Sequence, residues 1–181
     1  RRFYDEAPAL GSMLLAREVP DHGGDTMFAS MYLAYEALSP GFKTMLEGLR
    51  AVHSSRHIFG PNAGYHGTDL KGRLHNPDQA QQDAVHPVVI RHPESGKRAL
   101  FVNPSYTVRL EGLEPGESEA LLGFLFRHLT QSRFHLRHHW SPDDLVAWDE
   151  RSTVHLAPTD FQPHRRRLIR VAVGSEAPRA S

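Results

Sequence analysis

The chain has 181 residues, of which 39% are hydrophobic and 23% are charged, a composition typical of a folded globular domain. Its 21 lysine and arginine residues balance its 21 aspartate and glutamate residues. The resulting net charge of zero argues against a partner recognised by bulk electrostatics, such as a nucleic-acid backbone or an anionic membrane. The chain contains no cysteine, which excludes disulfides, thiolate zinc sites, iron–sulfur clusters and cysteine nucleophiles. Any metal ion must therefore be held by histidine and carboxylate ligands, which suit iron, manganese, copper or zinc.

The sequence shows neither a membrane span nor a secretion signal. Its longest apolar stretch, from Ala120 to Phe126, has seven residues, far fewer than the roughly twenty that a bilayer requires. The chain opens with charged residues instead of an apolar segment. We therefore predict a cytoplasmic protein without membrane contact. Because the first residue is Arg1 and not methionine, we also expect a further segment to precede it.

The first third of the chain predicts one strand and two helices. A mostly apolar run from Ser12 to Val19 ends at Pro20 and indicates a buried strand. A helix is predicted from Met27 to Leu38, because its apolar residues form a broad side of a helix. A second helix is predicted from Phe42 to Leu49, after a break at Ser39-Pro40-Gly41.

The rest of the chain predicts short strands around one helix, after a long polar segment. Residues 54–85 are rich in turn-forming residues and show little periodicity, which is typical of a functional loop in a compact domain. Apolar residues at helical spacing predict an amphipathic helix from Glu117 to Leu129. The expected strands are residues 87–91, 99–103, 134–140, 145–149, 153–156 and 167–173.

These elements predict a mainly β fold with flanking α-helices, a β-sandwich or jelly roll, in a single domain over residues 1–181. The regular alternation of strands and helices that is typical of a doubly wound parallel sheet is not seen. The sequence also lacks a P-loop, a Gly-x-Gly-x-x-Gly motif after a strand, and a Gly-x-Ser-x-Gly nucleophile elbow. Nucleotide binding and serine hydrolase chemistry are therefore disfavoured.

Histidine and arginine are the residue types best suited to chemistry in this chain. The adjacent His138 and His139 point to opposite faces of a predicted strand, so they are not expected to bind one ion together. Further on, Arg166 and Arg170 share one face of a predicted strand. Two inward arginines require anions against them. The alternative is a basic edge strand, Arg165 to Arg170, that faces water or a nucleic-acid phosphate.

Short motifs spread along the chain carry a family resemblance. They are residues 9–14, 16–20, 23–26, 34–38, 86–89, 92–97 and 99–103, together with Trp148-Asp149, His155, Arg165-Arg166 and Arg170. Through them the chain resembles the taurine dioxygenase family of Fe(II)- and 2-oxoglutarate-dependent oxygenases over essentially its whole length. The resemblance implies a double-stranded β-helix, a cupin-like jelly roll, whose mouth holds iron through two histidines and one carboxylate.

The resemblance also implies roles for particular residues. His155 matches the second histidine ligand of the iron, and Thr26 and Arg166 match the pair that holds the distal carboxylate of 2-oxoglutarate. This assignment agrees with the need of a buried dianion for a cationic partner. The implied reaction consumes O2 and 2-oxoglutarate, releases succinate and CO2, and hydroxylates a carbon of the substrate.

For the substrate, the resemblance implies a small, anionic, sulfonate-like organic molecule. Arg170 matches the residue that faces the sulfonate in the taurine-type enzymes, and Phe59 and Tyr106 match aromatic residues placed against the substrate. Trp148 is expected to pack beside the site. Residues 54–85 would form the lid that excludes water, and the family implies a homo-oligomer, either a dimer or a tetramer.

The sequence departs from the family pattern at two places. The first histidine and the carboxylate of the family form a His-x-Asp motif that would fall at about Arg1 and just before it, so we expect these ligands in a preceding segment. Asp5 and Glu6 are nearby carboxylates that lie outside the motif. Glu150 stands where the family usually has asparagine after Trp-Asp, and we expect it to alter a turn and not the chemistry.

Two other classes of function remain open. A non-catalytic jelly-roll relative would bind a dicarboxylate or a partner protein through Thr26 and Arg166 without iron, with His155 as a core histidine. Iron content separates this reading from the oxygenase. Nucleic-acid binding through the C-terminal arginines is disfavoured by the zero net charge.

Overall fold

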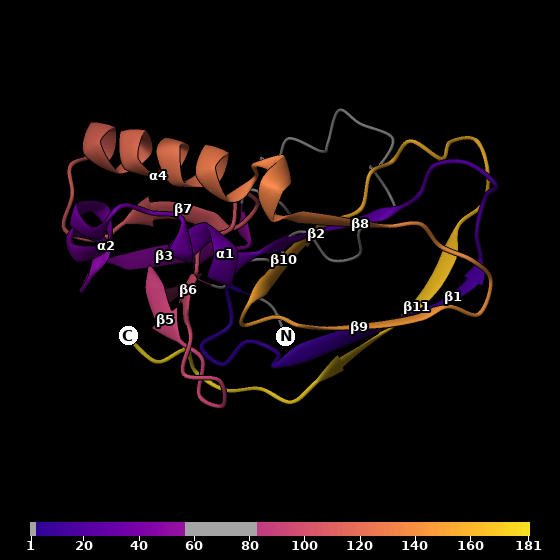
Figure 1. Cartoon of the computed structure of the whole chain (residues 1–181), viewed down its shortest axis with the longest axis horizontal. Helices are drawn as coiled ribbons and strands as arrows, with labels where there is room; N and C mark the ends of the chain where they lie inside the picture. The colour runs from indigo at the N-terminus through magenta and orange to yellow at the C-terminus, as the bar shows by residue number, and fades with distance from the viewer. Residues whose placement is uncertain (1–2, 57–82) are drawn as a thin grey trace.

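Two three-stranded antiparallel sheets extend from the helical end of the molecule and face each other (Figure 1). The computed structural model describes residues 3–56 and 83–181. The ring centroids of Phe28 in one sheet and Trp148 in the other are 5.3 Å apart, so the inner faces meet there. One sheet has the order β11-β1-β9 and the other β10-β2-β8. Their strands are β1 (Gly11–Glu18), β2 (Thr26–Ser30), β8 (His135–His138), β9 (Leu145–Asp149), β10 (Thr153–Leu156) and β11 (Arg167–Val173).

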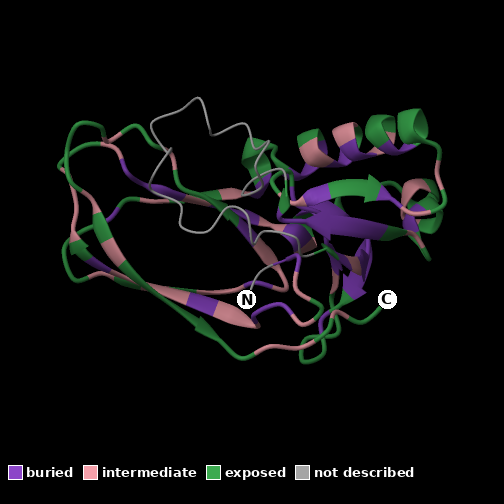
Figure 2. Cartoon of the chain, turned by 180° about the vertical axis from the view of Figure 1, so that it is seen from behind, coloured by how far each residue is buried: buried purple, intermediate pink, exposed green. Residues whose placement is uncertain are grey.

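The hydrophobic core lies at the end of the molecule where the helices pack on the remaining strands, and Figure 2 shows the buried residues gathered at this end. Apolar side chains that are fully buried there include Met31, Leu46, Phe101 and Leu125. The elements that enclose them are α1 (Met31–Glu36), α2 (Pro40–Leu46), α4 (Pro115–Leu129), β3 (Arg50–Ser54), β4 (Asp83–Pro87), β5 (Val89–Arg91), β6 (Arg98–Leu100) and β7 (Thr107–Leu110).

Helix α4 has clear start signals in the sequence. Pro115 occupies its first turn, and Glu114 and Glu117 form a capping box in which the Glu117 carboxylate accepts the backbone N–H of Glu114 at 3.0 Å. Leu122 and Leu125 of this helix are buried in the core. The predicted helix at Glu117–Leu129 is thereby confirmed, with a start two residues earlier. Among the described residues, no helix combines the length and apolarity needed to cross a membrane.

The mainly β fold with flanking helices is confirmed, and several predicted strands are found at their expected places. The strands predicted at 145–149, 153–156 and 167–173 coincide with β9, β10 and β11. The helix predicted from Met27 to Leu38 is wrong over its first four residues. That segment belongs to β2, which pairs with β8 and β10 on its two sides. The helix begins only at Met31, where the Ser30 Oγ accepts the backbone N–H of Leu33 at 3.3 Å.

Other differences arise where strand pairing, which the local pattern does not show, decides the structure. Strands β3 and β7 were not predicted, and they pair with each other through Ala51 and Leu110. The strand predicted at 87–91 is divided into β4 and β5 after Pro87, which has no N–H to donate. Ser54 ends β3 and Asp83 begins β4, so the predicted loop 54–85 is shorter than expected. Its remaining part, from 57 to 82, and with it the expected lid, lies outside the described residues.

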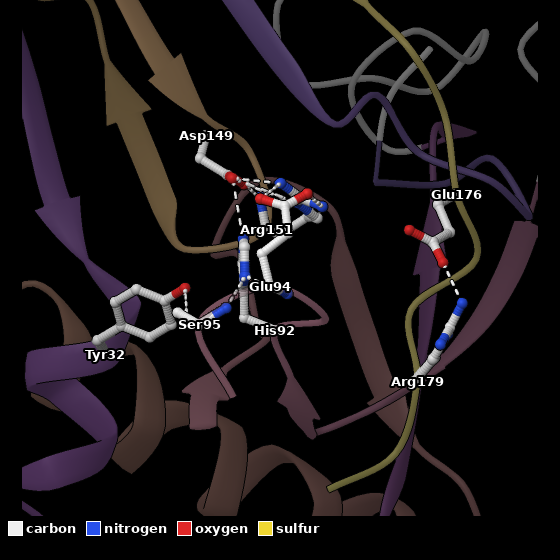
Figure 3. A network of polar contacts seen from close by, with 8 residues as sticks. All are labelled: Tyr32, His92, Glu94, Ser95, Asp149, Arg151, Glu176 and Arg179. Atoms are coloured by element: carbon white, nitrogen blue, oxygen red, sulfur yellow. Dashed lines mark hydrogen bonds and ion pairs between the residues drawn. The ribbon is translucent and has the colours of Figure 1, made fainter. Parts of the chain in front are cut away.

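A polar network joins the turn after β9 to the turn after β5 (Figure 3). The Asp149 carboxylate accepts hydrogen bonds from His92 Nε2 at 2.9 Å and from Arg151 Nε at 3.0 Å. His92 Nδ1 accepts the backbone N–H groups of Glu94 and Ser95, so its proton is on Nε2 and points to Asp149. Burial would raise the pKa of Asp149, but the hydrogen bonds from Arg151 and His92 hold it below its ordinary value.

This network fixes which way the neighbouring side chains point. Successive residues of a strand face opposite sides, so an Asp149 carboxylate held on the outer side directs Trp148 and Glu150 to the inner side. The observed contacts of both residues agree, because Trp148 meets Phe28 across the molecule and Glu150 meets Ser12. Asp149 therefore orients two residues of the inner face without touching that face itself.

Two buried histidines, His53 on β3 and His86 on β4, lie next to the hydrophobic core. His53 is fully buried, its Nδ1 is 3.1 Å from Thr107 Oγ1, and its Nε2 has no hydrogen-bond partner among the described residues. His86 Nε2 donates to the carbonyl oxygens of Phe3 and Asp5 at 3.1 and 3.0 Å. Burial lowers the pKa of His53 to about 3 and also lowers the pKa of His86. Both imidazoles are therefore neutral in the folded protein at neutral pH.

We expect the free energy of unfolding to fall as the pH is lowered from about 6.5 towards 3. The unfolded chain takes up protons in this range that folded His53 excludes, which costs up to about 1.4 kcal/mol per pH unit for that residue. His53→Gln should flatten this dependence, while His22→Gln, at an exposed position, should not. Urea unfolding at pH 7 and pH 5 measures it, and parallel slopes for His53→Gln and the unmodified protein would contradict the assignment.

The Asp149 network predicts a second effect on stability. Asp149→Asn removes the charge opposite Arg151, whose side chain is only 14% exposed, and turns an amide toward two donors. We expect a loss of about 2–3 kcal/mol in the free energy of unfolding, measured with urea. Glu94→Gln removes the exposed partner of the same arginine and should cost at most about 0.5 kcal/mol. Equal losses for the two variants would show that Asp149 has no special role.

Candidate functional site

The residues singled out in the sequence analysis lie on the inner faces of the two sheets or at their ends. Thr26 begins β2 and His155 lies on β10. Arg166 comes directly before β11, and Arg170 lies four residues later, within that strand. In the pairing of β2 with β10, His155 lies opposite Phe28. Strands that are far apart in sequence therefore bring the candidate cofactor and metal residues to one side of the molecule.

Thr26 and Arg166 are in direct contact, as their proposed shared role requires. Arg166 donates an Nη2–H to Thr26 Oγ1 at 3.3 Å and its Nε–H to the carbonyl oxygen of Gly24 at 2.7 Å. Within residues 3–56 and 83–181, no carboxylate lies within ion-pair distance of this guanidinium. Burial lowers the pKa of Arg166. Arg166 is therefore a half-buried cation with N–H groups to spare. The carboxylates of Asp160 and Asp25 act to raise its pKa from a distance, but neither forms an ion pair with it in the described protein.

The hydroxyl of Thr26 has an unused proton. Its oxygen accepts the Trp140 Nε1–H at 3.0 Å as well as the Arg166 Nη2–H, so both of its lone pairs are occupied. Thr26 is 1% exposed, and none of the described residues accepts its O–H. A buried donor without an acceptor is costly. Thr26 and Arg166 thus present unsatisfied donors side by side, which is the complement of a carboxylate.

The Gly23-Gly24 turn makes room for this arrangement. Both glycines have positive φ, of 75° and 70°, which disfavours residues with a Cβ. A Cβ on Gly24 would lie 2.9 Å from the Arg166 Cδ, and one on Gly23 would lie 2.7 Å from the Asp160 carbonyl oxygen. Asp160 also accepts the backbone N–H of Gly24 at 2.8 Å. The two glycines therefore let the chain approach the segment that carries Arg166.

Asp25, the acidic residue next to Thr26, forms an ion pair with Arg137. The Asp25 carboxylate accepts hydrogen bonds from Arg137 Nε and His139 Nδ1, the second at 2.7 Å. Burial would raise the pKa of Asp25, but these bonds hold it below its ordinary value. His138 instead lies against Trp140, with ring centroids 4.6 Å apart. The two adjacent histidines therefore go to different partners, as expected from a strand.

His155 lies between the two sheets. Its ring centroid is 4.9 Å from that of Trp148 and 6.4 Å from that of Phe28. It lines two neighbouring cavities, of about 110 and 220 Å³. His155 is an exposed residue by its accessible surface. Desolvation by the surrounding protein nevertheless lowers the pKa of His155 and favours the neutral imidazole, the form that binds metal ions.

The Trp148 side chain packs against His155 and Phe28, beside the candidate site as predicted. Its indole N–H is buried without a partner among the described residues.

The candidate substrate residues gather at the smaller cavity. Tyr106 and Arg170 line the cavity of about 110 Å³ together with His155. Tyr106 also packs edge-on against Tyr4, with ring centroids 5.4 Å apart. Phe59, the other aromatic residue expected at the substrate, lies outside the described residues. The structure therefore brings together three of the residues singled out for metal and substrate.

Glu150 has a place in this cavity that the sequence analysis missed. It was expected to alter only a turn, yet its Oε1 accepts hydrogen bonds from Arg170 Nη2 at 2.9 Å and from Ser12 Oγ at 2.7 Å. Glu150 is 8% exposed and lines the cavity beside His155. The one sequence signal was its departure from the asparagine of the family pattern. Ser12, which lies in an apolar strand, carried no signal.

Of the three expected iron ligands, the described residues include one candidate, His155. Apart from residues 1–2 and 57–82, the chain holds no cluster of three or more histidine, aspartate or glutamate side chains arranged to bind a metal ion. Asp5 and Glu6 accordingly do not complete a site with His155. The described part of the chain therefore fits the dicarboxylate that the resemblance implies better than it fits the iron.

Comparison with known proteins gives a consistent result. The family model "Taurine catabolism dioxygenase TauD, TfdA family" matches residues 2–172. A "putative alpha-ketoglutarate-dependent sulfonate dioxygenase" of Schizosaccharomyces pombe is 37% identical over 97% of this chain and 43% of its own length. An "alpha-ketoglutarate-dependent 2,4-dichlorophenoxyacetate dioxygenase" of Cupriavidus pinatubonensis is 36% identical over 96% of this chain and 58% of its own.

A solved structure agrees with this. The crystal structure of a taurine dioxygenase from Burkholderia xenovorans superposes with a TM-score of 0.81 at 34% identity, over 98% of this chain and 56% of that one. This similarity confirms the jelly-roll fold. The chain spans about half the length of these relatives. The chain belongs to the TauD/TfdA family of α-ketoglutarate-dependent dioxygenases.

Proposed function

We propose that the protein is an Fe(II)- and 2-oxoglutarate-dependent dioxygenase, in which Thr26 and Arg166 hold 2-oxoglutarate. It would hydroxylate a small organic substrate and release succinate and CO2. The observation that carries this proposal is the pair of unsatisfied donors, a buried Thr26 hydroxyl beside an Arg166 guanidinium without a carboxylate partner among the described residues. A carboxylate bound there would satisfy both groups at once.

Each residue of this chain would have a limited task. Thr26 and Arg166 would bind the distal carboxylate of 2-oxoglutarate, and His155 would contribute one ligand to the iron. When bound, Fe(II) with 2-oxoglutarate supplies the oxidising chemistry with O2. Trp148 and Phe28, which pack near His155, would keep water from that side of the cavity. The substrate would lie against Tyr106 and Arg170 in the cavity that His155 also lines.

The names of the relatives do not decide the charge of the substrate of this chain. The relatives are named for a sulfonate and for 2,4-dichlorophenoxyacetate, which are both anionic. The sequence-based expectation of an anionic, sulfonate-like substrate depends on an Arg170 whose charge is available. In this chain the Glu150 carboxylate already contacts that guanidinium. The proposal here therefore stops at a small organic substrate.

The division of roles predicts a selective loss of 2-oxoglutarate binding. Arg166→Gln removes the charge that would face the carboxylate, so we expect its affinity for 2-oxoglutarate to fall on the order of 100-fold. The neighbouring Arg165 is 82% exposed and pairs with Glu18 at 3.6 Å, so Arg165→Gln should leave that affinity unchanged. Calorimetric titration of 2-oxoglutarate, with the protein made from its complete coding sequence, measures both variants.

The same titration decides between the two open functions. Tight 2-oxoglutarate binding together with stoichiometric iron after anaerobic reconstitution supports the dioxygenase. Binding without iron would favour a non-catalytic relative that holds a dicarboxylate. Equal affinities of Arg166→Gln and Arg165→Gln for 2-oxoglutarate would refute the proposed binding site itself.

The glycine turn gives an independent prediction. Gly24→Ala places a Cβ against the Arg166 side chain and should weaken 2-oxoglutarate binding about 10-fold by displacing the guanidinium. Gly112→Ala is the matched control, because Gly112 has a similar φ of 75° but no atom within 4 Å of an added Cβ. Both variants should lose about 1 kcal/mol of stability through the strained φ. Only Gly24→Ala should lose affinity, and equal affinities would contradict the role of the turn.

A further inference from the structure

Three side chains form a closed polar triangle on the inner face of the β11-β1-β9 sheet. Arg170 donates an Nη2–H to Glu150 Oε1 and to Ser12 Oγ, each at 2.9 Å. Ser12 in turn donates its hydroxyl proton to Glu150 Oε1 at 2.7 Å. Ser12 is 1% exposed and Glu150 8%, so two of the three members are firmly enclosed. The geometry holds the carboxylate against the guanidinium from two sides.

The pair changes the electrostatics of the cavity beside His155. Arg170 and Glu150 both line this cavity, and among its described lining residues they are the only ones with a permanent charge. Their charges cancel at a distance of 2.9 Å. The neighbouring Arg166, four residues earlier, has no carboxylate within ion-pair distance in the described part of the chain. The two arginines therefore differ in direct pairing: the Arg170 guanidinium contacts a carboxylate, whereas the carboxylates of Asp160 and Asp25 act on Arg166 only at longer range.

The remaining hydrogen-bonding capacity of the pair points to the kind of group that fits. Glu150 Oε1 already accepts two hydrogen bonds, whereas its Oε2 accepts none from the described residues. An anion placed against Arg170 would lie within a few ångströms of this carboxylate and be repelled. An uncharged group with a donor, such as an alcohol or an amide, can donate to Oε2 and accept from a free N–H of Arg170.

We infer that Glu150 is a specificity-determining residue that makes this cavity select a substrate with an uncharged, hydrogen-bond-donating polar group over one with a sulfonate, sulfate or carboxylate. The inference rests on the proposed function in that it takes this cavity as the substrate site. The 2-oxoglutarate residues Thr26 and Arg166 are outside the triangle and are unaffected by it.

The test uses two probes with the same hexyl chain, hexanesulfonate and heptanamide. Glu150→Gln keeps an oxygen that accepts from Ser12 and Arg170, removes the charge, and places an amide NH2 group where Oε2 was. We expect it to bind hexanesulfonate 10- to 100-fold more tightly than the unmodified protein does. We expect it to bind heptanamide more weakly, because the NH2 group cannot accept the N–H of this probe. Calorimetric titration under anaerobic conditions, with the protein made from its complete coding sequence and with Fe(II), measures both affinities.

Two further variants keep the test decisive. Glu47→Gln removes a carboxylate from a surface pair with Arg98 and should change neither affinity. Glu150→Asn removes the same charge with a shorter amide and should reproduce the gain, and it stands in if Glu150→Gln fails to fold. If the ratio of the two affinities stays within threefold of its original value in the folded variant, the inference is overturned. The same holds if no variant binds hexanesulfonate.

The test is independent of the proposed cofactor. Each titration is repeated with and without saturating 2-oxoglutarate. A protein that does not bind 2-oxoglutarate refutes the proposed function, while the sulfonate titration without it still decides the role of Glu150. A protein that binds 2-oxoglutarate but shows no effect of Glu150→Gln keeps the proposed function and loses this inference.

Discussion

A half-buried guanidinium needs acceptors for its N–H groups, and the acceptors of Arg166 join three separate parts of the chain. It reaches the Gly24 carbonyl in the turn before β2 and the Thr26 hydroxyl at the start of that strand, while its own backbone leads into β11 of the opposite sheet. The two sheets are thereby linked at this position. The link remains electrostatically incomplete within the described residues, because Arg166 has no anion and Thr26 has no acceptor. The described part of the fold thus leaves donors unsatisfied, and the carboxylate of the proposed 2-oxoglutarate would satisfy them.

The elements that were predicted well are those whose local pattern agrees with their pairing. Strands β9, β10 and β11 have apolar or alternating runs bounded by turns, and the structure places them where they were expected. The segment after Thr26 was misread because its residues also fit a helical side, and only the partners β8 and β10 decide for a strand. Strands β3 and β7 were not predicted because they, too, are determined by pairing with each other and not by a local pattern. Pairing between distant segments is not encoded in a local period.

The sequence predicted part of the candidate site, and there is a physical reason why it did not predict the rest. Motif resemblance identified Thr26 and Arg166, and the structure places the two side chains in contact. The part played by Glu150 depended on the direction of one side chain, which is set by its neighbour. Asp149 is held outward by His92 and Arg151, so Glu150 turns inward to Ser12. The sequence shows that Glu150 replaces the asparagine of the family pattern. It does not show that Asp149 is held by His92 and Arg151, which determines where the Glu150 side chain points.

Arg166 and Arg170 illustrate how one residue type takes two roles on one surface. They lie four residues apart, Arg166 just before β11 and Arg170 in the middle of it, and each donates to a hydroxyl, of Thr26 and of Ser12 respectively. Of the two, and within residues 3–56 and 83–181, only Arg170 also forms an ion pair with a carboxylate, that of Glu150. An arginine with a hydroxyl alone attracts an anion, whereas an arginine with a carboxylate offers hydrogen bonds without net charge. The number of arginines at a site therefore does not predict the charge of its ligand. What matters is whether a carboxylate of the protein pairs with each guanidinium.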